Sequence, residues 1–403
     1  MDNLFIARQP IYNQKNAVMG YELLYRSNSD NHAVFTDGDQ ASCETILNTF
    51  MHIGIDSLTG SSLAFINLPR EFIVNDSLTP MFNEQAVLEV LEDVEPDEVV
   101  INGIKRLKSE GYKIALDDFI YRDELIPFIE LADFIKIDVL SLDRAAVEQQ
   151  LKLLSPYKTL LVAEKVETLE LYEFCRNLNF DYFQGFFFCQ PEMLKQKALP
   201  SNKLVTLNLI NRLQNPEITS EELEQILVQD ITLSYKLLRY INSASFSLRR
   251  EVDSIKDAIV LLGLNNLKDW ITLIMMSKVI ESKPTELIVI GMIRGKMCEL
   301  LAERNHPEIK HQMFIIGLFS VLDALMDQPM IDLLDTVTLS TEVKFALLDK
   351  AGIHGDIYNN ALLYEKCNWQ ELSKAKINSV EYIQSYLTAV HWADQSLKAL
   401  LND

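Results

Sequence analysis

The sequence predicts an α/β barrel of the TIM-like class, followed by an all-α domain. In the first half, short apolar runs that end on a polar side chain recur about every 20 to 45 residues, the spacing of strands separated by helices in such a barrel. After about residue 195, apolar residues at helical spacing replace these runs almost completely. With 403 residues, of which 48% are hydrophobic, the chain is long enough for two domains that each build a core.

The apolar runs of the first half predict successive strands, and each ends on an acid, an amide or a lysine. Because the active sites of α/β barrels lie at the C-terminal ends of their strands, we expect these polar side chains to share one pocket. The endings are YELL at Glu22, AFIN at Asn67, VLEVLE at Glu89, IALDD at Asp117 and Asp118, DFIKID at Lys136, LLVAE at Glu164 and FQGFFF at Gln184.

The second half predicts a series of helices. Thr219 and Glu222 have the spacing of a capping box, and the apolar Leu223, Ile226 and Leu227 follow at helical spacing. Further helices are predicted over residues 233–241, 254–262, 267–280, 285–304, 312–326 and 379–400. A polar stretch with two prolines, 190–201, separates the two halves. We therefore predict a barrel domain at 1–192, a linker at 193–201 and a helical domain at 202–403.

The composition of the chain indicates which kinds of binding partner and which cellular compartment are expected. A formal net charge of −21 disfavours nucleic acid, whose binding requires a dense Lys and Arg surface. The 5 cysteines form no CxxC pair, which is typical of a reduced compartment. No secretory signal is visible, and the apolar segments 270–276 and 313–326 are shorter than the roughly 18 residues that suggest a membrane span. We expect a cytoplasmic protein that binds neither nucleic acid nor membrane.

Carboxylates and an amide at one barrel mouth offer hard oxygen ligands, which suit Mg²⁺ or Mn²⁺ better than zinc. The adjacent pair Asp117-Asp118 suits two metals, which together stabilise the attacking and leaving oxygens of a phosphoryl displacement. Lys136 is placed to polarise a nucleophilic water, and Arg26 to clamp a phosphate. The pattern is therefore typical of a metal-dependent phosphoryl-transfer site.

Each of these side chains also has a simpler interpretation. A lone acid after an apolar run is usually a turn residue or the N-cap of the next helix, and the pair Asp117-Asp118 is equally consistent with capping. Lys136 with Asp138 is consistent with an exposed ion pair, and Arg26 with a solvated strand end. Because polar endings recur along the whole first half of the chain, a shared pocket is favoured over these separate simpler roles.

The polar strand ends belong to longer motifs that follow one another in order. They are Gln9-Pro10-Ile11, Glu22-Leu23-Leu24-Tyr25-Arg26, Asn67, Glu89-Val90-Leu91-Glu92, Asp117-Asp118-Phe119, Lys136-Ile137-Asp138, Ala163-Glu164-Lys165-Val166-Glu167, and Gln184-Gly185 with Pro191. In this order, over residues 4–192, they resemble the EAL domain, a TIM-like barrel. Its active members hydrolyse cyclic di-GMP to the linear dinucleotide pGpG with Mg²⁺ or Mn²⁺.

The resemblance implies a role for each matching position of this chain. It makes cyclic di-GMP the ligand and predicts a cyclic di-GMP-specific phosphodiesterase with two metal ions. The implied metal ligands are Glu22, Asn67, Glu89 and Asp117, with Asp118 at the second ion; the catalytic residues are Lys136 and Glu164, which position or deprotonate the attacking water; and Gln9, Arg26, Glu167 and Gln184 bind the dinucleotide.

The chain departs from the family pattern directly after Asp118. Active members carry a Gly-rich, Ser-containing loop there, which couples dimerisation to metal and substrate binding, whereas this chain has IYRDEL over 120–125. Asn67 is also followed by Leu68-Pro69 rather than by a serine two residues on. We therefore expect weak or regulated hydrolysis. A homodimer, which the resemblance implies, is a separate expectation. The alternative is a catalytically inactive cyclic di-GMP sensor or a protein-interaction scaffold.

The second half resembles an HDOD domain, a helical relative of the HD phosphohydrolases that has lost their metal site. The match lies in DITLSYKLLRYINSA over 230–244, SIKDAI over 254–259 and Leu262-Gly263. An active HD site requires a His-Asp doublet, and none occurs in the sequence. The resemblance therefore implies a regulatory or interaction module that contacts other signalling proteins.

Overall fold

The computed structural model describes residues 4–27, 54–75, 85–185, 187, 201–242, 252, 254–278, 283–375 and 379–401. The chain divides into two compact units, Met1–Phe188 and Cys189–Asp403. The first is an α/β barrel, and the described residues of the second form helices joined by turns, without a strand, so the predicted fold class is confirmed. The predicted linker 193–201, except for its last residue, lies outside the described residues.

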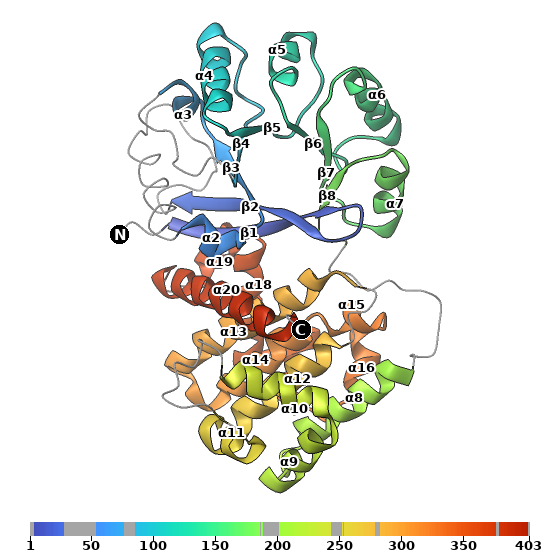
Figure 1. Ribbon diagram of the computed structural model, residues 1–403, viewed down its shortest axis with the longest axis vertical. Helices are drawn as coiled ribbons and strands as arrows, with labels where there is room; N and C mark the ends of the chain where they lie inside the picture. The colour runs from blue at the N-terminus through green and yellow to red at the C-terminus, as the bar shows by residue number, and fades with distance from the viewer. Residues whose placement is uncertain are drawn as a thin grey trace. The chain divides into compact units, whose positions relative to one another are not determined.

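The first unit is a closed barrel whose strands follow one another in sequence order (Figure 1). β1 pairs antiparallel with both β2 and β8, while every other neighbouring pair is parallel. The carboxyl ends of β2 to β8 therefore meet at one mouth of the barrel. The strands are β1 (Leu4–Asn13), β2 (Val18–Ser27), β3 (Leu63–Leu68), β4 (Ala86–Val90), β5 (Lys113–Leu116), β6 (Phe134–Asp138), β7 (Leu160–Glu164) and β8 (Tyr182–Gln184).

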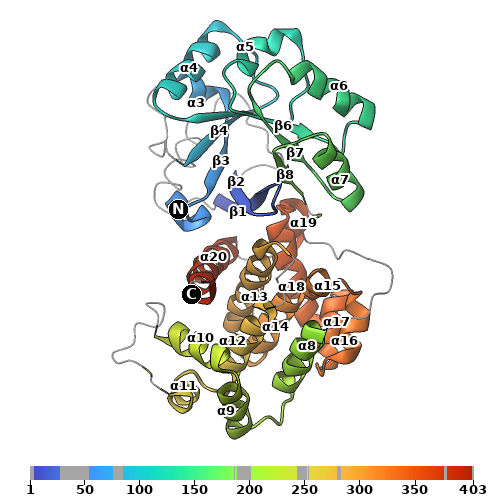
Figure 2. The same ribbon diagram turned by 45° about the vertical axis from the view of Figure 1, so that its right-hand side comes forward.

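Helices cover the outside of the ring, as Figures 1 and 2 both show for α4 to α7. The longest, α4, buries Val100, Ile104 and Leu107, which share one helical face, against the barrel. The helical elements of this unit are α2 (Ile55–Thr59), α3 (Arg70–Val74), α4 (Glu98–Ser109), the 3₁₀ turn η2 (Asp123–Leu125), α5 (Ile126–Ile129), α6 (Arg144–Leu154) and α7 (Leu169–Asn177).

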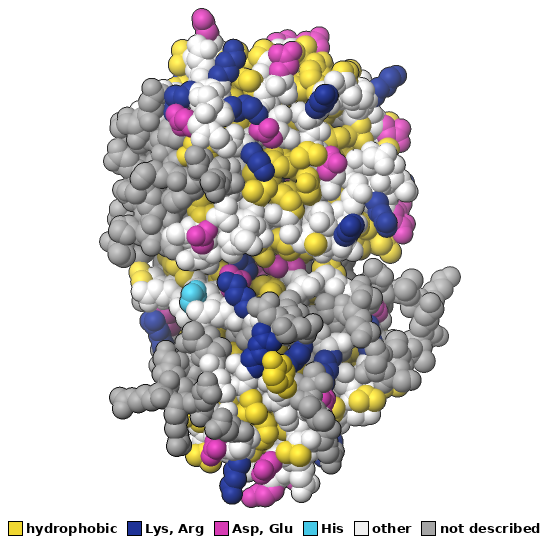
Figure 3. Space-filling model, viewed as in Figure 1, with side chains coloured by type: hydrophobic (Ala, Val, Ile, Leu, Met, Phe, Trp, Pro, Cys, Tyr) yellow, Lys and Arg dark blue, Asp and Glu magenta, His cyan; other side chains and the backbone are white. Residues whose placement is uncertain are grey.

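An apolar layer fills the barrel interior. Phe65 and Phe134 meet edge to face there, with their ring centroids 5.3 Å apart. On the face of this unit in Figure 3, hydrophobic side chains gather at the centre of the ring and charged side chains stand around it. The buried members of the layer are Ile11, Phe65, Val87, Ala115, Phe134 and Val162.

The second unit confirms the predicted capping box, because the Thr219 hydroxyl accepts from the Glu222 backbone while the Glu222 side chain accepts from Thr219. α13 is buried along most of its length and packs against α14 and α20. The helices are α8 (Ser201–Gln214), α9 (Ser220–Gln229), α10 (Ile231–Ile241), α11 (Ile255–Leu262), α12 (Leu264–Ser277), α13 (Thr285–Asn305), α14 (Lys310–Phe319), α15 (Leu322–Met326), α16 (Met330–Thr336), α17 (Thr341–Asp349), α18 (Gly352–Glu365), α19 (Trp369–Lys374) and α20 (Ser379–Leu401), with a 3₁₀ turn η6 at Pro307–Ile309.

The single helix predicted over 312–326 is wrong, because α14 ends at Phe319 and α15 begins at Leu322. The Ser320 hydroxyl at this break donates to the Gly317 carbonyl oxygen at 2.6 Å and accepts from the Arg294 guanidinium. Arg294 also forms two hydrogen bonds, of 2.8 and 2.7 Å, with the Glu365 carboxylate. A partly buried polar network thus occupies the point where the sequence pattern suggested continuous helix.

Within the described residues, no single helix is long and apolar enough to cross a membrane. In the same described ranges, α11 and α12 taken together reach that length and composition, and they are bent by 117° at the break between them.

Candidate active site

A polar layer lies directly beyond the apolar layer of the barrel interior. Because side chains alternate along a strand, a residue two positions after an inward-facing one also faces inward. The strands therefore carry the apolar layer and the predicted site residues on the same inner face. Asn67, Glu89, Asp117, Lys136 and Glu164 stand two residues after Phe65, Val87, Ala115, Phe134 and Val162, respectively.

Lys136 is fully buried at the centre of this polar layer. Its Nζ lies 2.7 Å from Oε1 of Glu89 and 2.7 Å from Oδ1 of Asp117. The same Nζ lies 2.9 Å from Oε1 of Glu164 and 3.3 Å from Oε2 of Glu22. We call these four acids the carboxylate cluster. The exposed ion pair of Lys136 with Asp138, one of the two interpretations of the sequence, is therefore wrong.

The carboxylate cluster brings four acids around a single ammonium group, that of Lys136. Burial raises the pKa of Glu89 well above its usual value, although Lys136 lowers it, and burial raises the pKa of Glu164 to about 8. Burial alone lowers the pKa of Lys136, but the surrounding carboxylates, Glu164 first, together raise it well above its usual value. Burial thus disfavours charge on Glu89 and Glu164, and a single ammonium faces four acids, an arrangement that a further cation would relieve.

Gln184 ties β8 and β1 to the cluster. Its Nε2 donates to Oε2 of Glu22 at 2.7 Å and to Oε1 of Gln9 at 3.0 Å. Pairing in the barrel explains the contact, because Gln9 stands opposite Glu22, and Gln184 stands opposite Ile11 on β1. Two residues predicted to bind the dinucleotide therefore lie beside a predicted metal ligand.

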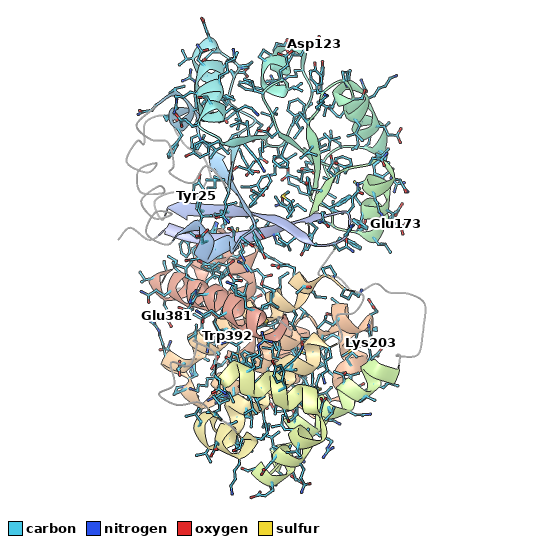
Figure 4. The ribbon with its side chains drawn as sticks, in the orientation of Figure 1. Tyr25, Asp123, Glu173, Lys203, Glu381 and Trp392 are labelled. Atoms are coloured by element: carbon cyan, nitrogen blue, oxygen red, sulfur yellow. The ribbon has the colours of Figure 1, made fainter. Side chains whose placement is uncertain are left out.

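Buried oxygen atoms in the polar layer have unused hydrogen-bonding capacity. Oδ1 of Asn67, Oε2 of Glu89 and Oε1 of Gln184 have no hydrogen-bond partner among the described residues. The Asn67 backbone is fixed nevertheless, because the Tyr25 hydroxyl on β2 donates to its carbonyl oxygen at 2.6 Å (Figure 4 labels Tyr25). Unpartnered buried oxygens are costly unless a ligand satisfies them.

The donor set fits a divalent cation in its chemistry, since carboxylate and amide oxygens are the ligands that Mg²⁺ and Mn²⁺ prefer. The carboxylates nevertheless converge on the Lys136 ammonium. Within the described part of the chain, no three His, Cys, Asp or Glu side chains surround a common point suited to a metal. A cation at this site would therefore share the cluster with Lys136.

A second lysine pairs with the outer acids. Nζ of Lys165 lies 2.6 Å from Oδ2 of Asp138 and 3.3 Å from Oδ1 of Asp118. Burial raises the pKa of Asp138, but hydrogen bonds from Lys165 and from two backbone N–H groups bring it below its usual value. Asp118 thus pairs with Lys165, whereas its neighbour in sequence, Asp117, pairs with Lys136 in the carboxylate cluster.

The acids at the strand ends do not cap the helices that follow them. The N-caps of α4, α6 and α7 are Asp97, Asp143 and Thr168, whose side chains accept from the backbone N–H three residues on. Glu167, predicted to bind the dinucleotide, is exposed. Arg26 lies on β2 opposite Phe5, and its side chain is outside the described residues.

The unusual segment after Asp118 is anchored to the barrel through its backbone. The N–H of Phe119 donates to the carbonyl oxygen of Lys136 at 2.9 Å. The N–H of Tyr121 donates to Oε1 of Gln150 on α6 at 2.7 Å, and the 3₁₀ turn η2 follows. The residues beside the site are therefore ordered without the glycines and serines of the family loop.

Sequence reasoning missed the role of Lys165, which stands at the variable position of its motif. Its backbone has φ 56°, in the left-handed region that favours glycine. A lysine in this conformation is unusual and would have drawn attention to the position, but the backbone angle is known only from the structure. Only the structure shows that its ammonium faces the predicted second metal position.

The chain matches two family models, the EAL domain over residues 44–191 and the HDOD domain over residues 199–327. Gln9, Glu22 and Arg26 lie before the first of these ranges. The cyclic di-GMP phosphodiesterase CdgJ of Vibrio cholerae serotype O1 is 33% identical over 374 residues, which cover 92% of this chain and 87% of that protein. The uncharacterized protein YuxH of Bacillus subtilis is 32% identical over 406 residues, which cover 98% and 99%.

Solved structures of EAL proteins also match the chain. The YkuI protein of Bacillus subtilis, solved with its substrate c-di-GMP and calcium, is 17% identical, with a TM-score of 0.38 over 64% of this chain and 73% of that one.

Proposed function

Because the chain belongs to the family of proteins in which an EAL domain precedes an HDOD domain, we propose that its barrel hydrolyses cyclic di-GMP with the help of a divalent cation. The observation that carries the proposal is the buried carboxylate cluster around Lys136, with the unpartnered Asn67 oxygen beside it. A cluster whose negative charge exceeds its positive charge, at the mouth of a barrel, suits a cation and a phosphodiester.

We propose Glu22, Asn67, Glu89 and Asp117 as the residues that would hold Mg²⁺ or Mn²⁺. When bound, the cation supplies Lewis-acid stabilisation of charge on the phosphoryl oxygens. Glu89 on β4 and Asn67 on β3 stand opposite each other in the parallel register, so both oxygens reach the same region. Gln184 orients Glu22 through its 2.7 Å hydrogen bond.

Lys136 and Glu164 are proposed to act on the attacking water. Lys136 would hold the water by donating to it a hydrogen bond that now goes to one of its acids, and Glu164, whose carboxylate lies 2.9 Å from that ammonium, would accept the proton as oxygen attacks phosphorus. The bond between phosphorus and the 3′ oxygen breaks, and the leaving oxygen takes a proton from solvent, to which Glu164 then releases the proton of the attacking water. One water is consumed, and the product is the linear dinucleotide pGpG with a 5′ phosphate.

The test is a phosphodiesterase assay on the full chain with Mg²⁺ and with Mn²⁺. We expect conversion to pGpG by wild type, loss of it in Glu22→Ala, and retention in Glu130→Gln, which neutralises an exposed acid at the end of α5. Absence of hydrolysis above the Glu22→Ala level with both metals would count against the proposal.

A sensor without catalysis is the second candidate, and the segment 120–125 favours it because the family's coupling loop is replaced there. Calorimetric titration with cyclic di-GMP separates the two. Binding without turnover supports the sensor, whereas absence of binding excludes both. In either case we propose the HDOD half as the regulatory and partner-binding module.

A further inference from the structure

The resemblance to EAL domains predicts a second divalent cation at Asp118, but Lys165 already contacts this acid. Its Nζ lies 3.3 Å from Oδ1 of Asp118 and 2.6 Å from Oδ2 of Asp138. We propose that the Lys165 ammonium takes the place of the second cation, so that this barrel binds one divalent cation rather than two. The inference rests on the proposed metal-dependent function of the barrel.

The backbone on both sides of this contact has an unusual conformation. Lys165 has φ 56° and Asp118 has φ 41°, both in the left-handed region that favours glycine. Such conformations cost free energy in residues that carry a Cβ, and they persist where the surroundings fix them. Here the ion pairs of Lys165 with Asp118 and Asp138 join the two turns.

Charge balance shows which of the two positions would take a cation. Lys136 is surrounded by the four acids of the carboxylate cluster, whereas Lys165 contacts two acids. The unpartnered oxygen of Asn67 also belongs to the cluster side, since Asn67 stands opposite Glu89. Uncompensated charge and free oxygen ligands therefore coincide at the cluster. At Asp118, one ammonium faces two acids rather than four, so less negative charge is left uncompensated there.

The Lys165 pair is open to solvent, which sets the size of the expected effect. The side chains of Lys165 and Asp118 are 47% and 40% exposed, so their attraction is partly screened. Lys165 is therefore a competitor that a second cation can displace at high concentration. Removing its charge should tighten binding of a second cation by about tenfold, because both the repulsion and the competition disappear.

Calorimetric titration of the metal-free full chain with Mn²⁺ at low ionic strength tests the proposal. We expect one ion per chain for wild type, and two for Lys165→Gln. Lys165→Arg keeps the charge and should keep one ion. Lys158→Gln makes the same charge change at an exposed position just before β7, and should also keep one. Lys165→Gly, which suits φ 56°, is the second neutral variant and should bind two.

Electron paramagnetic resonance provides an independent readout. Two Mn²⁺ ions in one site broaden each other's signal, so we expect this broadening in Lys165→Gln and not in wild type. A second ion bound by wild type as tightly as by Lys165→Gln, or one ion bound by both neutral variants, would overturn the inference and leave the proposed function standing. No Mn²⁺ bound by wild type would instead count against the proposed function, and the inference would fall with it.

Discussion

Replacing Lys136 by methionine tests whether its ammonium is what allows four acids to meet inside the barrel. Methionine nearly preserves the volume and removes the charge. Lys136 and Glu89 are both fully buried, so the carboxylate of Glu89 would lose its nearest cation with no access to water. We therefore expect the barrel unit to become less stable, while the helical unit is unaffected.

The magnitude follows from burial. Removing one partner of a buried ion pair usually costs about 3–5 kcal/mol, because it leaves an uncompensated charge. Protonation of Glu89 and Glu164 limits this cost in the variant, since burial already raises the pKa of both. We expect a loss of about 3 kcal/mol near neutral pH. The matched control is Lys165→Met. The Lys165 side chain is 47% exposed, so loss of its ion pairs should cost about 1 kcal/mol or less of barrel stability.

The loss should also depend on pH in a defined direction. In Lys136→Met the native barrel holds protons on carboxyl groups that release them in the unfolded chain, where the pKa of Glu164 returns to about 4.5. The native state then binds more protons than the unfolded state, so stability falls as pH rises above that value. The deficit relative to wild type should therefore be smaller at about pH 5 than at about pH 8.

Native-state hydrogen exchange in increasing urea, read by mass spectrometry on the strand peptides, measures the barrel separately. All 3 tryptophans (Trp270, Trp369 and Trp392) lie in the helical unit, so tryptophan fluorescence reports that unit as an internal reference. Equal barrel stability in Lys136→Met and wild type would refute the reasoning, as would a deficit that grows toward acid pH.

Burial raises the pKa of Asp269 from 3.8 to about 6, and the hydrogen bond with Asp269 raises the pKa of His311. The native state therefore binds more protons than the unfolded state, so the stability of the helical unit should fall as pH rises from about 4 to 7. Asp269→Asn should flatten this fall in urea midpoints followed by tryptophan fluorescence, and a wild-type midpoint independent of pH would contradict it. Burial also raises the pKa of the Cys175 thiol to about 12, so N-ethylmaleimide at about pH 8 should leave it unmodified in native protein, as peptide mass spectrometry can verify. Gly185→Ala should destabilise the barrel by about 3 kcal/mol or more in the same hydrogen-exchange experiment, because its Cβ would lie 2.2 Å from the Val166 carbonyl oxygen; unchanged exchange would contradict this.

Much of the site was predictable because strand geometry is periodic. An inward-facing Phe65 or Phe134 implies that Asn67 or Lys136 faces inward two residues later, and the polar endings make this visible in the sequence. The fold class follows from the same pattern. Convergence of the ends at one mouth follows from parallel pairing of the strands.

The partners of each side chain were not predictable. Sequence left Lys136 open to an exposed pair with Asp138, because adjacent motif residues suggest local contacts. In the structure, Lys136 instead pairs with acids from four other strands or strand ends, and Asp138 forms an ion pair with Lys165. Such pairings depend on the radius of the barrel and on left-handed turns, which no local pattern encodes. The break between α14 and α15 has the same origin, since the Arg294 side chain reaches it from the neighbouring helix α13.

Hydrolysis by the barrel can be measured directly in a single-turnover reaction in ¹⁸O-labelled water. Wild-type protein in excess over cyclic di-GMP, with Mn²⁺, should give pGpG that carries one ¹⁸O on its 5′ phosphate, because water attacks phosphorus. Glu89→Gln should give none. Recovery of intact, unlabelled cyclic dinucleotide from wild type with both Mn²⁺ and Mg²⁺ would contradict the account.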